Sequence, residues 1–82
     1  MLTNLYKKRI LTIWERTLTN CWYYYNERAP ESLMNEVGTL RGLYYAAEAC
    51  QIKLPENDIK AFKKFNDEAY KRKSKEMEKL YE

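Results

Sequence analysis

Apolar side chains recur at helical spacing through the first third of the chain and predict a helix over about residues 3–28. At 100° per residue, one face collects Ile10, Leu11, Trp14, Leu18, Cys21, Trp22 and Tyr25. The edge of this face is widened by Tyr6, Ile13 and Tyr24. The opposite face is polar and carries Lys8, Thr12, Glu15, Arg16, Thr19 and Asn26. We expect the helix to end before Pro30, because proline disfavours α geometry at the residue that precedes it.

A second helix is predicted over about residues 31–51 and has two apolar faces. One face carries Leu33, Val37, Leu40, Leu43, Tyr44, Ala47 and Cys50. The other is a run of small residues: Gly38, Gly42, Ala46 and Ala49. Glycine inside a helix costs about 1 kcal/mol relative to alanine, so this face is expected to admit the close approach of another helix. We favour a helix of the same chain, and the alternative is a partner's helix in a two-fold dimer or higher oligomer.

A third helix is predicted over about residues 58–80. Its apolar stripe runs through Ile59, Phe62, Phe65, Ala69 and Tyr70, after which Lys73 and Glu76 fall at core positions. A small apolar patch returns at the end, with Met77, Leu80 and Tyr81. The sequence therefore predicts one all-α domain over residues 1–82. We expect a three-helix antiparallel bundle with the second helix in the middle and a long charged C-terminal helix that overhangs the core.

The small size of the chain makes self-association an expected source of stability. A core within 82 residues rarely supplies more than about 3–5 kcal/mol without disulfides, metals or oligomerisation. Cys21 and Cys50 are the only cysteines and there is no histidine, so a zinc site has too few ligands. We expect both cysteines to be reduced and packed in the core, and we expect no metal and no cofactor. Without a signal segment or an 18-residue apolar run, the chain is expected in the cytoplasm.

The residues that carry enzyme chemistry are missing from the sequence. The commonest general acid–base, histidine, is absent. The chain also lacks a Gly-x-Ser-x-Gly elbow and a glycine-rich phosphate loop. We therefore expect a protein that is not an enzyme.

Four consecutive aromatic residues, Trp22, Tyr23, Tyr24 and Tyr25, form the most unusual feature of the sequence. On a helix they cannot all face one core, and Tyr23 falls on the polar side. One interpretation is an interface anchor or stacking platform. The other places Trp22 and Tyr25 in the core and leaves Tyr23 and Tyr24 at its rim. A similar pair follows in the second helix, where we expect one ring inward and Tyr45 outward.

These features favour a non-enzymatic protein-binding module that self-associates and blocks a partner's surface stoichiometrically. Its expected contacts are Trp22, Tyr23, Tyr24, Tyr45, Met77, Leu80 and Tyr81. A small, Lys/Asn/Tyr-rich helical chain without enzyme chemistry resembles, in general type, the phage-encoded proteins that inhibit a host component. That resemblance implies an inhibitor acting in the host cytoplasm.

The alternative function is binding of RNA, DNA or a nucleotide. It would use exposed tyrosines and the basic side chains Lys7, Lys8, Arg9 and Arg16. The first 28 residues hold five basic and two acidic side chains, which favours contact with phosphates. Residues 55–82 are nearly balanced, with eight basic and seven acidic side chains. That balance is typical of a solvated helix.

Overall fold

The computed structural model describes residues 2–81, and the side chains of residues 4–71 within them. Over this range the chain forms three helices and no strand: α1 (Leu2–Asn26), α2 (Pro30–Ala49) and α3 (Glu56–Tyr81). The all-α prediction is therefore confirmed, and the helix ends lie close to their predicted positions.

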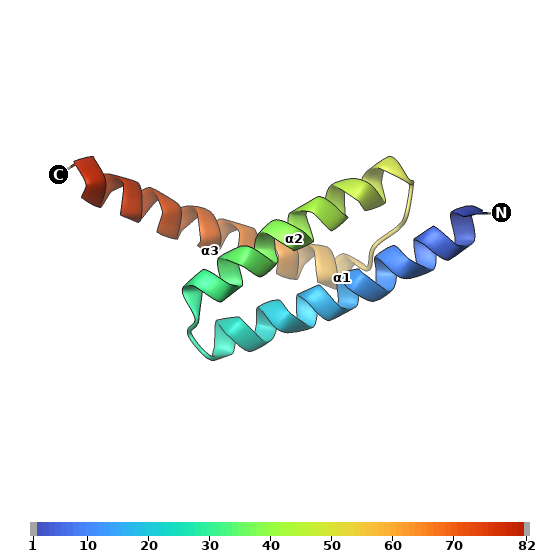
Figure 1. Cartoon of the computed structure of the whole chain (residues 1–82), viewed down its shortest axis with the longest axis horizontal. Coiled ribbons are helices and arrows are strands. Elements are labelled where there is room, and N and C mark those ends of the chain that lie inside the picture. Colours follow the sequence, from blue (N-terminus) through green and yellow to red (C-terminus); the bar gives the residue numbers. More distant parts are fainter. Residues whose placement is uncertain (1, 82) are drawn as a thin grey trace.

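The first two helices lie side by side and run in opposite directions, joined by a short turn (Figure 1). The third crosses this pair obliquely, and the start of α1 and the end of α3 lie at opposite sides of the molecule (Figure 1). Contacts along α2 reach both α1 and α3, whereas the backbones of α1 and α3 approach each other at fewer points. The overhang of the charged C-terminal half stays a prediction, because the side chains of residues 72–82 lie outside the described part of the chain.

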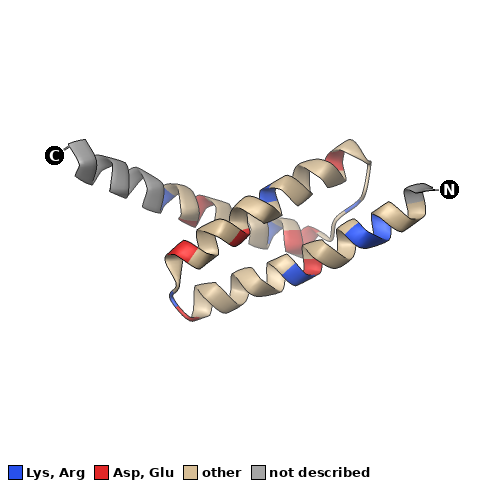
Figure 2. Cartoon of the chain, in the orientation of Figure 1, with Lys and Arg blue, Asp and Glu red and all other residues tan. Residues whose placement is uncertain are grey.

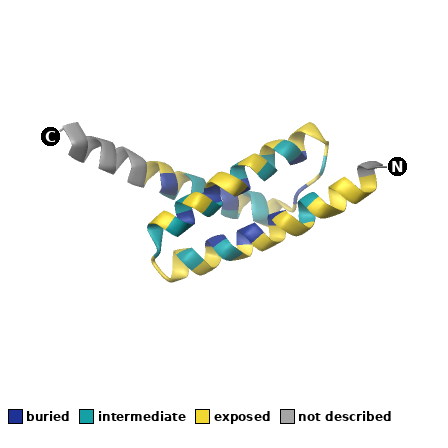
Figure 3. Ribbon diagram, in the orientation of Figure 1, coloured by how far each residue is buried: buried dark blue, intermediate teal, exposed yellow. Residues whose placement is uncertain are grey.

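The core lies where the three helices face one another (Figure 3). Trp14, Cys21, Val37, Leu40 and Phe65 are fully buried, as the helical spacing predicts. Between α1 and α3 the space is filled by aromatic rings that meet edge to face. The ring centroids of Trp14 and Phe62 lie 5.9 Å apart. This packing explains why the two backbones stay further apart than those of α1 and α2.

The buried indole of Trp14 ties α1 to the start of α3. Its Nε1 donates a hydrogen bond of 3.2 Å to Oδ2 of Asp58. The third helix begins at Glu56, so Asp58 lies in its first turn, where the helix dipole favours a negative charge. One contact therefore satisfies a buried donor and places a carboxylate at a favourable helix position.

Both α1 and α2 end two residues earlier than predicted, because each closes with a left-handed residue that is not glycine. Arg28 has φ 54° and Gln51 has φ 56°. After α1, the amide of Arg28 donates to the carbonyl of Tyr25 and that of Ala29 donates to the carbonyl of Tyr24. This pair of bonds is the Schellman motif, which usually places glycine at the left-handed position. The sequence has no glycine at these two positions, so the predicted ends of α1 and α2 lie two residues too far along the chain.

Replacing Arg28 with glycine is expected to stabilise the fold by about 0.5–1 kcal/mol. A side chain in the left-handed region costs roughly 1–2 kcal/mol, and glycine removes that cost while adding freedom to the unfolded chain. The measurement is urea unfolding followed by circular dichroism. Glu27→Gly is the control, because Glu27 lies outside the left-handed region and should gain nothing. A loss of stability in Arg28→Gly would show that the arginine side chain contributes more than its backbone costs.

Candidate protein-binding face

The small-residue face of α2 is open. Gly38 and Gly42 are exposed, and a Cβ atom built on either one would meet, among the described residues outside the adjoining backbone of α2, no atom within 4 Å. Ala49 is also exposed, whereas Ala46 is half-buried. Among the described residues, no helix of the same chain packs against these glycines, contrary to the preferred expectation. The opposite face of α2, which carries Leu33, Val37, Leu40 and Ala47, makes the contacts with the rest of the fold.

A hollow of about 170 Å³ lies beside Gly38, between α2 and α3. Its walls are Met34 and Arg41 from α2 and Ala69 and Tyr70 from α3. The hollow opens onto the surface at Gly38, because glycine has no side chain that would cover the opening. It is sized for a single side chain of a partner, and too small for most cofactors.

Arg41 is held in one position at the edge of this hollow. Its Nε and Nη2 donate hydrogen bonds of 3.2 and 2.7 Å to Oδ1 of Asn66. The guanidinium carbon lies 5.3 Å from the ring centroid of Tyr70. Because the side chain is already ordered, a partner that accepts a hydrogen bond from its remaining N–H groups pays little further entropy.

The two adjacent tyrosines of α2 face in different directions, as predicted. Tyr44 lies inward and stacks on Phe62, with ring centroids 5.0 Å apart. Tyr45 points outward and is 61% exposed. It lies on the same side of α2 as Gly38 and Gly42, so the exposed ring and the open glycines belong to one surface. We call this surface, made by Gly38, Arg41, Gly42, Tyr45 and Tyr70, the glycine face.

The four aromatic residues of α1 are not divided between core and surface in either of the predicted ways. Trp22 and Tyr25, the expected core pair, are 39% and 36% exposed, whereas Tyr24 is half-buried against the core. Tyr23 is exposed, as predicted. The physical reason is that Trp22 and Tyr25 lie at the edge of α1 nearest α3. There each ring meets Phe65 on one side only, with centroids 4.7 and 5.7 Å away.

Lys64 covers part of the exposed faces of the Trp22 and Tyr25 rings. Its Nζ lies 5.6 Å from the Trp22 ring centroid and 4.9 Å from that of Tyr25. A cation over an aromatic face is attracted by the ring quadrupole. These two rings thus already carry a cation of the same chain and are less exposed than Tyr23 and Tyr45, which makes them weaker anchors for a partner.

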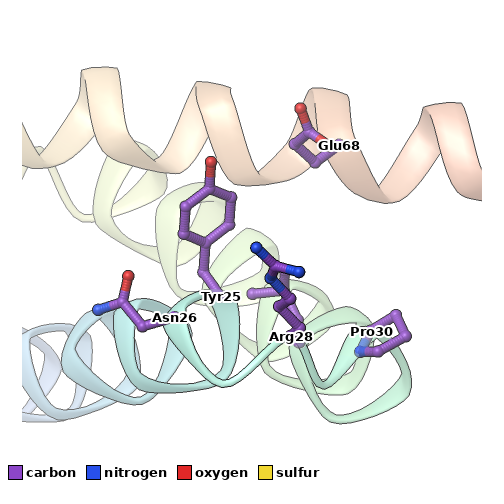
Figure 4. Close-up of a pocket in the computed structure, with 6 residues that line it drawn as sticks. Tyr25, Asn26, Arg28, Pro30 and Glu68 are labelled. Atoms are coloured by element: carbon purple, nitrogen blue, oxygen red, sulfur yellow. The ribbon is translucent and has the colours of Figure 1, made fainter.

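A cleft of about 470 Å³ lies at the end of α1, next to this aromatic pair (Figure 4). Tyr25 points from α1 toward α3, Arg28 lies on the turn and Glu68 belongs to α3 (Figure 4). Asn26, Pro30 and Leu33 complete the lining. The cleft holds one guanidinium and one carboxylate. Among its described lining residues there is neither a nucleophile with an adjacent base nor a pair of carboxylates.

The two cysteines occupy different environments. Cys21 is buried as predicted, and burial, with a smaller contribution from the charge of Glu36, raises the pKa of its thiol to about 12. Such a thiol is unreactive, because only the thiolate is nucleophilic. Cys50 is exposed, so its predicted core position is wrong. The reason is that α2 ends at Ala49, which leaves Cys50 in the turn. Within the described residues no three metal-ligating side chains come together.

A thiol reagent should therefore modify Cys50 quickly and Cys21 only on unfolding. At about pH 8 a thiol with a pKa near 12 is thiolate in roughly one molecule in ten thousand. Mass spectrometry after labelling in buffer should find one adduct, and labelling in denaturant should find two. The Cys50→Ser variant is the control and should take up no label while folded. Fast labelling of that variant would contradict the buried position of Cys21.

The basic residues proposed for phosphate contact, Lys7, Lys8, Arg9 and Arg16, are all exposed on α1 (Figure 2). Arg9 and Tyr23 are separated by 14 residues, which is about 20 Å along a helix. Lys7, Lys8 and Arg9 therefore do not flank the exposed part of the aromatic run, whereas Arg16 lies seven residues before Tyr23, about two turns away on the same side of α1. Of the other predicted contacts, Met77, Leu80 and Tyr81 have side chains outside the described range.

Three apolar side chains near the start of α1 were missed as candidate contacts. Leu5, Tyr6 and Ile13 are largely exposed, although helical spacing placed Tyr6 and Ile13 at the edge of the apolar face. A signal was present in the sequence, because Leu5 lies opposite Trp14 on the helical wheel. An apolar residue on the polar side of a helix indicates either a surface contact or an isolated exposure.

Comparison of the chain with family models, with curated proteins and with solved structures yields no match. Across the described residues, no helix has the length and the apolar character needed to cross a bilayer.

Proposed function

We propose that this chain is a non-enzymatic protein-binding module that self-associates through the glycine face of α2. The observation that carries the proposal is the open space at Gly38 and Gly42. Two glycines in the middle of a helix cost about 2 kcal/mol relative to alanine, and here no contact within the described chain requires them. A partner helix that packs directly against the backbone gives them a physical reason.

The side chains around the glycines support this proposal. Tyrosine and arginine are the residue types that most often dominate binding energy at protein interfaces. Arg41 is ordered by Asn66, and the exposed rings of Tyr45 and Tyr70 border the same surface. In a two-fold dimer the glycine face of one subunit would contact the glycine face of the other. The exposed tyrosine rings of each subunit could then enter the hollow beside Gly38 of its partner.

We also propose that the three helices form an antiparallel bundle and that the charged end of α3 overhangs it. In this arrangement, the dimer presents Tyr23 and the end patch of Met77, Leu80 and Tyr81 to a further protein, which it inhibits by occupying a surface. The general type resembles phage-encoded inhibitors acting in a host cytoplasm. A second candidate, nucleic-acid binding, is favoured by the exposed cluster of Lys7, Lys8 and Arg9 on α1.

The test is the solution mass of the purified protein, measured by size-exclusion chromatography with light scattering at several concentrations. The proposal expects a defined dimer or higher oligomer whose absorbance is that of protein alone. A monomer at all concentrations would refute self-association. Co-purifying nucleic acid that high salt removes would support the second candidate, because phosphate contacts weaken steeply with salt.

A further inference from the structure

A shallow groove runs along the outer side of α1, away from the glycine face of α2. It measures about 430 Å³ and is lined by Leu5, Lys8, Arg9, Thr12 and Ile13, which we call the basic-apolar groove. Leu5 is 60% exposed and Ile13 is 44% exposed. The groove therefore offers aliphatic surface to solvent within a border of cations.

The spacing of these residues suits a helix as the occupant. Leu5, Lys8, Arg9 and Thr12 stand at i, i+3, i+4 and i+7, which is the diamond of four side chains that forms one hole for a knob of a facing helix. Arg9, Thr12, Ile13 and Arg16 repeat the same diamond one turn further along α1. Two successive holes match two successive apolar side chains on one stripe of a partner helix.

The charge of the surface indicates what else that helix must carry. Lys8 and Arg9 line the groove, Arg16 is exposed at its end, and the first acidic residue of the chain is Glu15. The first turn of α1 contains no acid, so the positive end of the helix dipole adds to these cations. No acidic side chain of α1 itself offsets the cations or the dipole in its first three turns, which favours a partner rich in carboxylates.

From the holes and the charge together, we propose that the basic-apolar groove docks an acidic amphipathic helix of another protein. Leu and Ile side chains of that helix would fill the two holes, and its Glu and Asp side chains would face Lys8, Arg9 and Arg16. Nucleic acid accounts for the cations but leaves Leu5 and Ile13 without an apolar counterpart. A membrane surface needs a broad apolar face, and this stripe has two aliphatic residues. The inference goes beyond self-association, since it uses another helix and does not require the dimer.

The test uses a fluorescent synthetic helix of about 18 residues, or five turns, with leucine on one face and glutamate elsewhere. Fluorescence anisotropy should detect saturable binding that weakens as salt is added. Two matched peptides separate the contributions: one replaces leucine with serine, and the other replaces glutamate with lysine. Both are expected to bind at least about tenfold more weakly. Equal binding of the serine peptide would overturn the proposal, because charge alone would then explain the affinity.

Variants of the protein locate the site. Ile13→Ser and Arg9→Glu are each expected to weaken binding about tenfold or more, with unchanged thermal unfolding. Lys60→Ser and Lys63→Glu, at exposed positions of α3, are the matched controls and should bind like the parent. Gly42→Leu should also retain binding, so that a failure of self-association is distinguished from a failure of docking. Unchanged affinity in both groove variants, or tighter binding to single-stranded RNA or to phosphatidylserine vesicles, would overturn the proposal.

Discussion

Replacing Phe65 with alanine is expected to remove most or all of the folded population at 25 °C. The ring is fully buried and packs edge to face on both Trp22 and Tyr25, so it is the main link between α3 and the end of α1. Truncating a buried phenylalanine costs about 3–5 kcal/mol. That is similar to the whole stability that a core of this size supplies, about 3–5 kcal/mol. Urea unfolding followed by circular dichroism should therefore lose its cooperative transition.

The control for this variant is Tyr23→Ala, which removes an aromatic ring of similar size from an exposed position of α1. It should change the free energy of unfolding by no more than about 0.5 kcal/mol. If Phe65→Ala stays folded with a loss below about 1 kcal/mol, the contact between α1 and α3 does not stabilise the protein. The fold would then rest on the α1–α2 pair alone, and α3 would be an appendage.

Helical periodicity was enough to predict the fold class and most of the core. The apolar stripes of the three segments contain Trp14, Leu40 and Phe65, and all three are buried as their spacing predicts. Periodicity fails at the edges of a stripe, because it cannot say how far a neighbouring helix reaches around it. Trp22 and Tyr25 lie at such an edge and stay partly exposed, since α3 supplies one ring to both.

Helix ends were less predictable, for a reason that the backbone makes clear. Proline at position 30 marked the start of α2 correctly, since proline is favoured in the first turn. No glycine marked the end of α1 or α2, because Arg28 and Gln51 take the left-handed position at a cost in energy. Cys50 was assigned to the core for the same reason: a longer α2 would have turned it inward.

The glycines at positions 38 and 42 show what sequence reasoning can and cannot decide. The spacing indicated that Gly38 and Gly42 share one side of α2 with Ala46 and Ala49. It could not tell whether a helix of this chain or of a partner covers that face, because the residues are the same in both cases. The structure speaks against the first possibility for the described residues, since none of their atoms lies within 4 Å of either Cβ position.

Replacing Gly42 with leucine should therefore have opposite effects on the single chain and on its assembly. Among the described residues the Cβ position of residue 42 is open, and leucine favours the helix by roughly 1 kcal/mol over glycine. In the proposed dimer, the same side chain holds the two backbones apart. We expect the mass measured by light scattering to fall to that of a monomer. We also expect the unfolding temperature of dilute samples to rise.

The dependence of stability on protein concentration makes this prediction sharper. A self-associating chain gains stability with concentration, because the folded form alone binds its partner. The parent should therefore melt at higher temperature in concentrated samples, and Gly42→Leu should lose that dependence. Thr19→Leu, at an exposed position of α1, is the matched control and should keep both the parent mass and its concentration dependence. If Gly42→Leu is more stable at every concentration and has the mass of the parent, the glycine face is not an interface. The two glycines would then lower helix stability without gaining a contact.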